Sequence, residues 1–194
     1  MTMTRREFAR RQNELFENDP FIEFAGSHIL YDNVIMNESC KIKAGAVIGF
    51  EGFGFERDEN GVPFRIPHIG KVVLGYDVEI GANTVIARGT VDDTVIGNNV
   101  KIDDCCFIAH NCNIGENTLI VAGSVICGSV KIGKNCFIGA NCTIKNKVTI
   151  GDFVTVGMGA NVVKDVPDGA TIAGFKAQPF ETMKRVARII ERSQ

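Results

Sequence analysis

Aliphatic residues recur at every sixth position along the middle of the chain, without a miss from Ile96 to Val162. A helix turns every 3.6 residues, so a six-residue step would place successive members on different faces. The step is that of hexapeptide repeats in a parallel β-helix, where each repeat supplies one short strand and a turn. The members are Ile96, Ile102, Ile108, Ile114, Ile120, Ile126, Ile132, Ile138, Ile144, Ile150, Val156 and Val162.

The position four residues after each aliphatic one is small or β-branched and never charged. Because side chains alternate between the two faces of a strand, both positions lie on one face and are predicted to point into the prism. Three strands are expected to close one triangular coil. The second inward set is Val100, Cys106, Cys112, Thr118, Ser124, Val130, Cys136, Cys142, Val148, Val154, Ala160 and Val166.

The same phase continues upstream in two blocks, Phe24 to Ile48 and Leu74 to Ile86. The sequence therefore predicts one all-β domain over residues 1–194: a parallel β-helix of hexapeptide repeats with short terminal helices. Its coils are expected at about 24–53 and 72–175, with a loop at about 50–71 leaving the prism. Between Ile86 and Ile96 the step is ten residues, which predicts a second, smaller bulge. The helices are expected at about 4–17 and 179–192.

The composition and charge of the chain argue against several classes of function. The net charge is −2, so no basic excess points to nucleic acid. No apolar run is long enough to span a membrane, and the N-terminus lacks a signal-peptide core, so we expect a cytoplasmic protein. Five of the seven cysteines take the inward phase and are interpreted as small buried hydrophobes in a reducing compartment, not as disulfides or a metal cluster. They are Cys40, Cys106, Cys112, Cys136 and Cys142.

One of the three histidines is the candidate for chemistry. His110 has an outward phase, whereas His28 has an inward one and His68 lies in the loop's return, where a conformational role is expected. Adding about one coil to His110 leads to Gly128, and Asp103 stands seven residues before it. A base, an orienting carboxylate and a backbone oxyanion donor are the groups that acyl transfer needs.

Several stretches resemble the UDP-3-O-acylglucosamine N-acyltransferases of the lipid A pathway. They include Ile66-Pro67-His68-Ile69-Gly70, Asp92-Asp93-Thr94-Val95-Ile96-Gly97-Asn98 and Ile108-Ala109-His110-Asn111. The resemblance implies a left-handed β-helix, a homotrimer and active sites in the grooves between subunits. It also implies that His110 is the catalytic base, Asp103 its partner and Gly128 the oxyanion donor.

The chain departs from that family in three places. It is too short for the family's N-terminal uridine-binding domain, and Lys147 stands where the family has another histidine. The stretch from Val166 to Ala177 instead resembles the last coil of acetyl-CoA-dependent sugar acetyltransferases, which implies that Lys176 lies near the donor. Lys147 and Lys176 are therefore the candidate donor-binding residues. We expect N-acylation, most simply acetylation, of a nucleotide-linked amino sugar by acetyl-CoA or another acyl-CoA, in lipopolysaccharide or glycan biosynthesis.

Alternatives remain open at this point. The donor could be an acyl carrier protein carrying a longer chain, as in lipid A biosynthesis, or the acceptor could be a sugar hydroxyl. A zinc-dependent β-helix such as a γ-type carbonic anhydrase needs three histidines around the metal, and only His110 has the outward phase for that role. A purely structural rod would leave the outward polar cluster unexplained.

Overall fold

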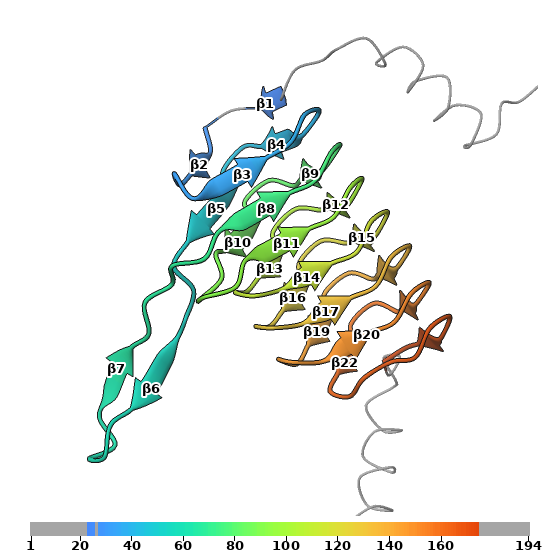
Figure 1. Cartoon of the computed structure of the whole chain (residues 1–194). Helices are drawn as coiled ribbons and strands as arrows, with labels where there is room; N and C mark the ends of the chain where they lie inside the picture. Colours follow the sequence, from blue (N-terminus) through green and yellow to red (C-terminus); the bar gives the residue numbers. More distant parts are fainter. Residues whose placement is uncertain (1–22, 26, 175–194) are drawn as a thin grey trace, which may run out of the picture.

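The computed structural model describes residues 23–25 and 27–174, and within them every regular element is a β-strand. Three parallel sheets form the sides of a prism, and the chain visits each sheet once per coil (Figure 1). An all-β parallel β-helix is therefore confirmed. The helices predicted at about 4–17 and 179–192 lie outside the described residues, and the left-handed sense stays a prediction from the resemblance.

The three sheets are named here A, B and C. Sheet A has eight strands in the order β1 (Glu23–Ala25), β4 (Lys41–Lys43), β9 (Glu79–Ile80), β12 (Lys101–Ile102), β15 (Leu119–Ile120), β18 (Phe137–Ile138), β21 (Thr155–Val156) and β23 (Thr171–Ile172). Sheet B has seven, in the order β2 (Ile29–Leu30), β5 (Val47–Phe50), β10 (Val85–Ala87), β13 (Phe107–Ile108), β16 (Val125–Ile126), β19 (Thr143–Ile144) and β22 (Asn161–Val162). Sheet C has six, in the order β3 (Val34–Met36), β8 (Val72–Leu74), β11 (Thr94–Ile96), β14 (Asn113–Ile114), β17 (Lys131–Ile132) and β20 (Thr149–Ile150).

The inward phase predicted from the six-residue step is confirmed, because every member of both sets is buried. Parallel pairing keeps the aliphatic residues in register, so that Ile108 stands beside Ile86 on one side and Ile126 on the other. Inward hydroxyls are satisfied by the backbone: Thr118 donates to the Gly133 carbonyl (2.9 Å) and Ser124 to that of Gly139 (3.0 Å). The core is thus a continuous apolar column whose few polar groups are paired.

The five inward cysteines are buried, and their thiols are free. Cys105 is exposed beside the buried Cys106. Among residues 23–25 and 27–174, no group of three or more metal-ligating side chains is present, and no helix is long and apolar enough to cross a membrane.

Two excursions leave the prism at one corner, where the chain passes from sheet B to sheet C. The larger, residues 51–71, contains an antiparallel hairpin of β6 (Phe55–Arg57) and β7 (Pro63–Arg65), which projects well away from the coils (Figure 1). The smaller, residues 88–93, lies one coil further on, between β10 and β11. The turns at 109–112, 127–130 and 145–148 continue the same corner, called here the B–C corner.

Candidate active site

His110 lies in the first turn of the B–C corner below the two excursions. Its Nδ1 is 2.8 Å from Oδ1 of the neighbouring Asn111. The orientation of that amide is set by backbone groups: Nδ2 donates to the Asp92 carbonyl (2.9 Å), and Oδ1 accepts the Thr90 N–H (3.1 Å). An oxygen facing His110 can only accept, so Nδ1 carries the proton and Nε2 holds the free lone pair. His110 is therefore in the tautomer that a general base at Nε2 requires.

Gly128 stacks against this ring from the next coil. A Cβ added there would lie 2.7 Å from His110 Cε1 and 2.8 Å from Nε2, so only glycine allows the approach. Within the described part of the chain the Gly128 N–H donates no hydrogen bond, whereas at the next corner the Lys134 N–H is taken by the Asp152 carboxylate (2.9 Å). A free amide beside Nε2 is what an oxyanion donor needs.

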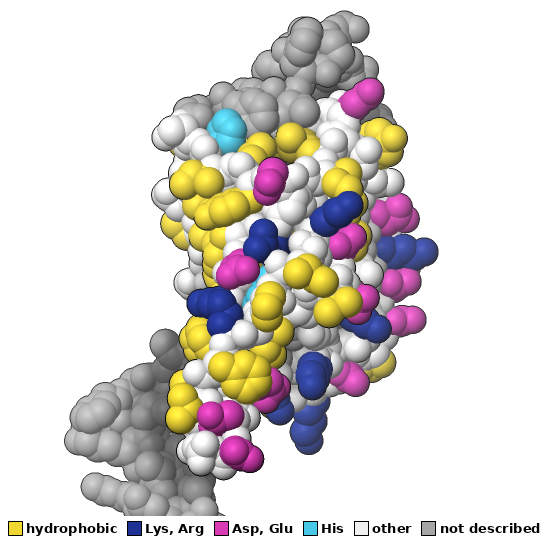
Figure 2. Space-filling view, turned by 60° about the vertical axis from the view of Figure 1, so that its left-hand side comes forward, with side chains coloured by type: hydrophobic (Ala, Val, Ile, Leu, Met, Phe, Trp, Pro, Cys, Tyr) yellow, Lys and Arg dark blue, Asp and Glu magenta, His cyan; other side chains and the backbone are white. Residues whose placement is uncertain are grey.

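A hollow of about 460 Å³ opens beside the imidazole on the side of sheet C. Its lining contains hydroxyl, amide and carboxylate groups and one lysine, so it can hydrogen-bond a polar molecule. Figure 2 shows that basic, acidic and hydrophobic side chains are interspersed over one face of the coils. The lining residues are Thr90, Asp92, Asp93, His110, Asn111, Asn113, Ser129 and Lys131.

His68 also lies beside this site, a position that the sequence, which indicated a conformational role, did not predict. The return of the larger excursion buries it, and its ring meets that of His110 edge to face, with centroids 5.3 Å apart. Beside it, Arg88 donates to the Glu51 carboxylate (3.0 Å), and that hydrogen bond lowers the pKa of Glu51. His68 of the larger excursion and an ion pair between the two excursions thus cover one side of the His110 corner.

The structure separates Asp103 from His110 within one chain. Asp103 follows β12 at the corner between sheets A and B, and its carboxylate accepts the Ala122 N–H (3.2 Å). The Nδ1 side of His110, where an orienting carboxylate was expected, is occupied by Asn111. A contact between Asp103 and His110 would have to join two copies of the chain.

Of the two candidate donor-binding lysines, Lys147 is among the described residues. Lys147 is exposed at the B–C corner one coil beyond Gly128, whose carbonyl accepts the Lys147 N–H (3.0 Å). Its backbone is thus held on the same edge as the imidazole. Lys176 lies outside the described residues.

No buried thiol in this region is suited to act as a nucleophile. Cys112 is close in sequence to His110, but burial raises the pKa of its thiol to about 12. A thiol held neutral in the core is a poor nucleophile. Cys127, next to Gly128, is half-buried.

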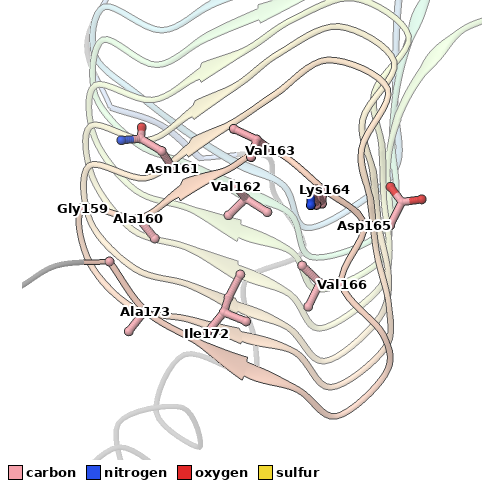
Figure 3. Close-up of a pocket in the computed structure, with 11 residues that line it drawn as sticks. Gly159, Ala160, Asn161, Val162, Val163, Lys164, Asp165, Val166, Ile172 and Ala173 are labelled. Atoms are coloured by element: carbon pink, nitrogen blue, oxygen red, sulfur yellow. The ribbon is translucent and has the colours of Figure 1, made fainter. Parts of the chain in front are cut away.

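A larger hollow of about 710 Å³ lies at the far end of the prism (Figure 3). It is lined by the last coils, from Gly159 to Gly174, and among these described residues the charged ones are Lys164 and Asp165. Its described lining contains no histidine, and its carboxylate, that of Asp165, already accepts the Thr149 N–H (2.7 Å). We therefore place the chemistry at the smaller hollow beside His110.

Substituting Gly128 with alanine is expected to lower kcat by roughly 10²-fold. The new methyl group would push the imidazole out of position, and a displacement of about 1 Å is enough for such a loss. Gly159→Ala is a stringent control for a glycine substitution elsewhere in the coils: nothing lies within 4 Å of a Cβ there, but its φ of +69° adds a backbone strain that Gly128, whose φ is not positive, does not have. Steady-state kinetics would check this, and a native kcat for Gly128→Ala would mean that the stacking has no role.

Two family models match the repeat region in which this candidate site lies. Residues 93–128 match the family described as "Bacterial transferase hexapeptide (six repeats)", and residues 129–164 match "Hexapeptide repeat of succinyl-transferase". These two segments contain His110, Gly128 and Lys147. The repeat region of the chain, residues 93–164, is thus similar to hexapeptide-repeat transferases.

The resemblance found in the sequence is confirmed by curated relatives, all UDP-3-O-acylglucosamine N-acyltransferases. The protein from Coxiella burnetii is 51% identical over 100 residues, which is 52% of this chain and 29% of the relative. That from Caulobacter sp. is 38% identical over 151 residues, 78% of this chain and 44% of the relative. The chain spans less than half the length of the relatives it matches.

Solved structures with the same fold are more distant in sequence. The UDP-N-acetylglucosamine acyltransferase of Francisella novicida superposes with a TM-score of 0.63 at 18% identity, covering 84% of this chain and 73% of that one. The Acinetobacter baumannii LpxA structure gives the same TM-score and identity, with 77% of that chain covered. At this identity the likeness establishes the β-helix alone.

Proposed function

We propose that this chain carries the catalytic β-helix of an N-acyltransferase that moves an acyl group from a thioester to the amine of a nucleotide-linked amino sugar. The observation that carries the proposal is the tautomer of His110, whose free Nε2 stands against Gly128 at the edge of a polar hollow. The relatives' names supply the class of acceptor.

The proposed reaction is direct transfer without an acyl-enzyme. The amine nitrogen attacks the thioester carbonyl carbon, and His110 Nε2 takes the amine proton as the C–N bond forms. The Gly128 N–H donates to the oxyanion of the tetrahedral intermediate. Collapse of the intermediate breaks the C–S bond, and the proton passes from His110 to the departing thiolate. Asn111 holds Nδ1 throughout, which keeps Nε2 aimed at the amine.

Asp103 has a place in this proposal only if copies of the chain assemble. It lines a hollow on sheet A together with the exposed Leu119 and Phe137. The lining also contains Lys43, Glu79 and Lys101, and this mixed apolar and charged surface fits an interface in which Asp103 reaches the His110 corner of another copy and orients or polarises the base. Asp103→Ala is then expected to cost less activity than loss of His110.

We expect a homotrimer in solution, because the exposed hydrophobic side chains along sheet A require cover and each site is completed by a neighbour. Light scattering coupled to gel filtration would measure the mass. A monomer that retained full activity would contradict the assembly and the role given to Asp103.

The donor is proposed to be acetyl-CoA or another acyl-CoA bound along the B–C corner, with Lys147 near its phosphates. Lys147→Glu should raise the KM for acyl-CoA severalfold while leaving kcat intact, because the contact is equal in the ground and transition states. The effect should shrink as salt screens an exposed charge. Lys134→Glu, an exposed lysine at another corner, is the control. Unchanged acyl-CoA kinetics together with efficient transfer from an acyl carrier protein would instead favour the carrier protein as donor.

Product mass spectrometry tests the acceptor class. Nucleotide-linked amino sugars and the matching hydroxy sugars would be offered with acetyl-CoA, longer acyl-CoAs and acyl carrier protein. We expect acyl mass only on the amino sugars. Acylation of the hydroxy sugars at equal rates would favour an O-acyltransferase, for which the same base is competent.

A further inference from the structure

His68 packs against His110, the candidate base. It lies in the stretch that leads from the hairpin back to β8. His68 is 1% exposed, and its ring is edge to face with that of His110 at an interplanar angle of 82°. Gly52 packs against both histidines: a Cβ at Gly52 would lie 3.0 Å from His68 Nε2 and 3.3 Å from His110 Cβ. The two imidazoles are therefore packed together by the start and the end of one excursion.

The protonation of His68 follows from its hydrogen bond. Its Nδ1 lies 3.0 Å from the Ile66 carbonyl, which can only accept, so Nδ1 carries the proton. Nε2 is then a bare acceptor, buried without a partner among the described residues. Burial lowers the pKa of His68, with the charge of a protonated His110 acting in the same direction. His68 is a neutral imidazole with an unsatisfied lone pair.

Such a group is costly in a purely structural position. A buried polar atom left without a partner destabilises a fold, and an aliphatic side chain would fill the same space without that cost. The His68 ring lies edge to face against the ring that gains a positive charge when His110 takes a proton. A neutral acceptor there stabilises an imidazolium and adds no competing charge.

We propose that His68 is a positioning residue for His110: its buried ring holds the imidazole against Gly128, and its unprotonated nitrogen favours the protonated form of His110 during transfer. This inference rests on the proposed function, in which His110 is the base. It gives the larger excursion a role at the reacting centre, since His68 arrives there only through the path of residues 51–71.

Two substitutions separate positioning from packing. His68→Leu fills the space but has neither donor nor acceptor, and it is expected to lower kcat by roughly 10- to 100-fold with KM unchanged. His68→Gln keeps a donor for the Ile66 carbonyl and an acceptor for His110, and its kcat is expected to stay within about threefold of native. Ile69→Ala, at an exposed neighbouring position, controls for disturbance of the stretch. Should His68→Leu fail to fold, His68→Phe, which retains the ring packing without the nitrogens, takes its place.

A double-mutant cycle distinguishes failure of this inference from failure of the proposed function. If His68 acts through His110, His68→Leu should cost no further activity in a His110→Ala background. A full 10- to 100-fold loss in that background, or native kcat in both His68→Leu and His68→Phe, would overturn the inference and leave the base intact. A rise in KM alone would also overturn it. Native activity of His110→Ala by itself would remove the proposed function, and the role of His68 with it.

Discussion

Replacing His110 with alanine is expected to lower kcat by roughly 10²- to 10⁴-fold, the usual contribution of a general base. Nε2 is the only free ring nitrogen, since Nδ1 donates to Asn111. The half-exposed side chain contributes little to the core, so the thermal transition should stay close to that of the native protein. Steady-state kinetics with the acceptor identified by product mass would measure the loss.

Thr143→Ala is the matched control for this substitution, because Thr143 is exposed on the same sheet two coils away and makes no side-chain hydrogen bond in the described part of the chain. It should leave kcat unchanged. A His110→Ala variant that turns over at the native rate would remove His110 from the mechanism.

Replacing Cys136 with lysine is expected to abolish the folded state. Cys136 is 2% exposed in the apolar column, and its thiol donates to the Gly151 carbonyl (3.1 Å). A prism this narrow has no room for water around an ammonium group. Burying the charge should therefore cost several kcal/mol, comparable to the whole stability of a domain at about 5–15 kcal/mol.

Thr155→Lys supplies the comparison, because Thr155 lies on the adjacent strand of the same sheet with its side chain outward. Circular dichroism and thermal melting should show a native fold for Thr155→Lys and none for Cys136→Lys. A soluble Cys136→Lys variant with an unchanged melting temperature would mean that the inward phase is wrong.

Much of the fold follows from local rules, which explains why the sequence was sufficient for it. One aliphatic residue per six, with a small residue four positions later, determines both the strand and the face that is buried. These local rules could not predict the hairpin of β6 and β7. Both its strands are exposed on both faces, so neither leaves a burial pattern, and only a loop could be predicted for residues 50–71.

Some residues of the candidate site could likewise be predicted from the sequence, and others could not. Gly128 was found because one coil is a constant number of residues, so that positions stack predictably. Asn111 was missed because asparagine with positive φ recurs at the turns, as at Asn99, Asn117 and Asn135, where it is an ordinary turn residue. Its contact with His110 depends on the path of residues 88–93. His68 was missed because its position depends on how a long excursion returns, which no short-range pattern encodes.

The measurement that tests the central claim most directly is a single-turnover experiment with an isotopically labelled acyl thioester and an amino-sugar nucleotide. Intact-protein and product mass spectra would be taken as the reaction proceeds, for the native protein and for His110→Ala. The account predicts that label passes to the amine with none on the native protein at any time, and that the variant transfers almost nothing. Label on the protein before product forms, as at the half-buried Cys127, or equal transfer by His110→Ala, would contradict it.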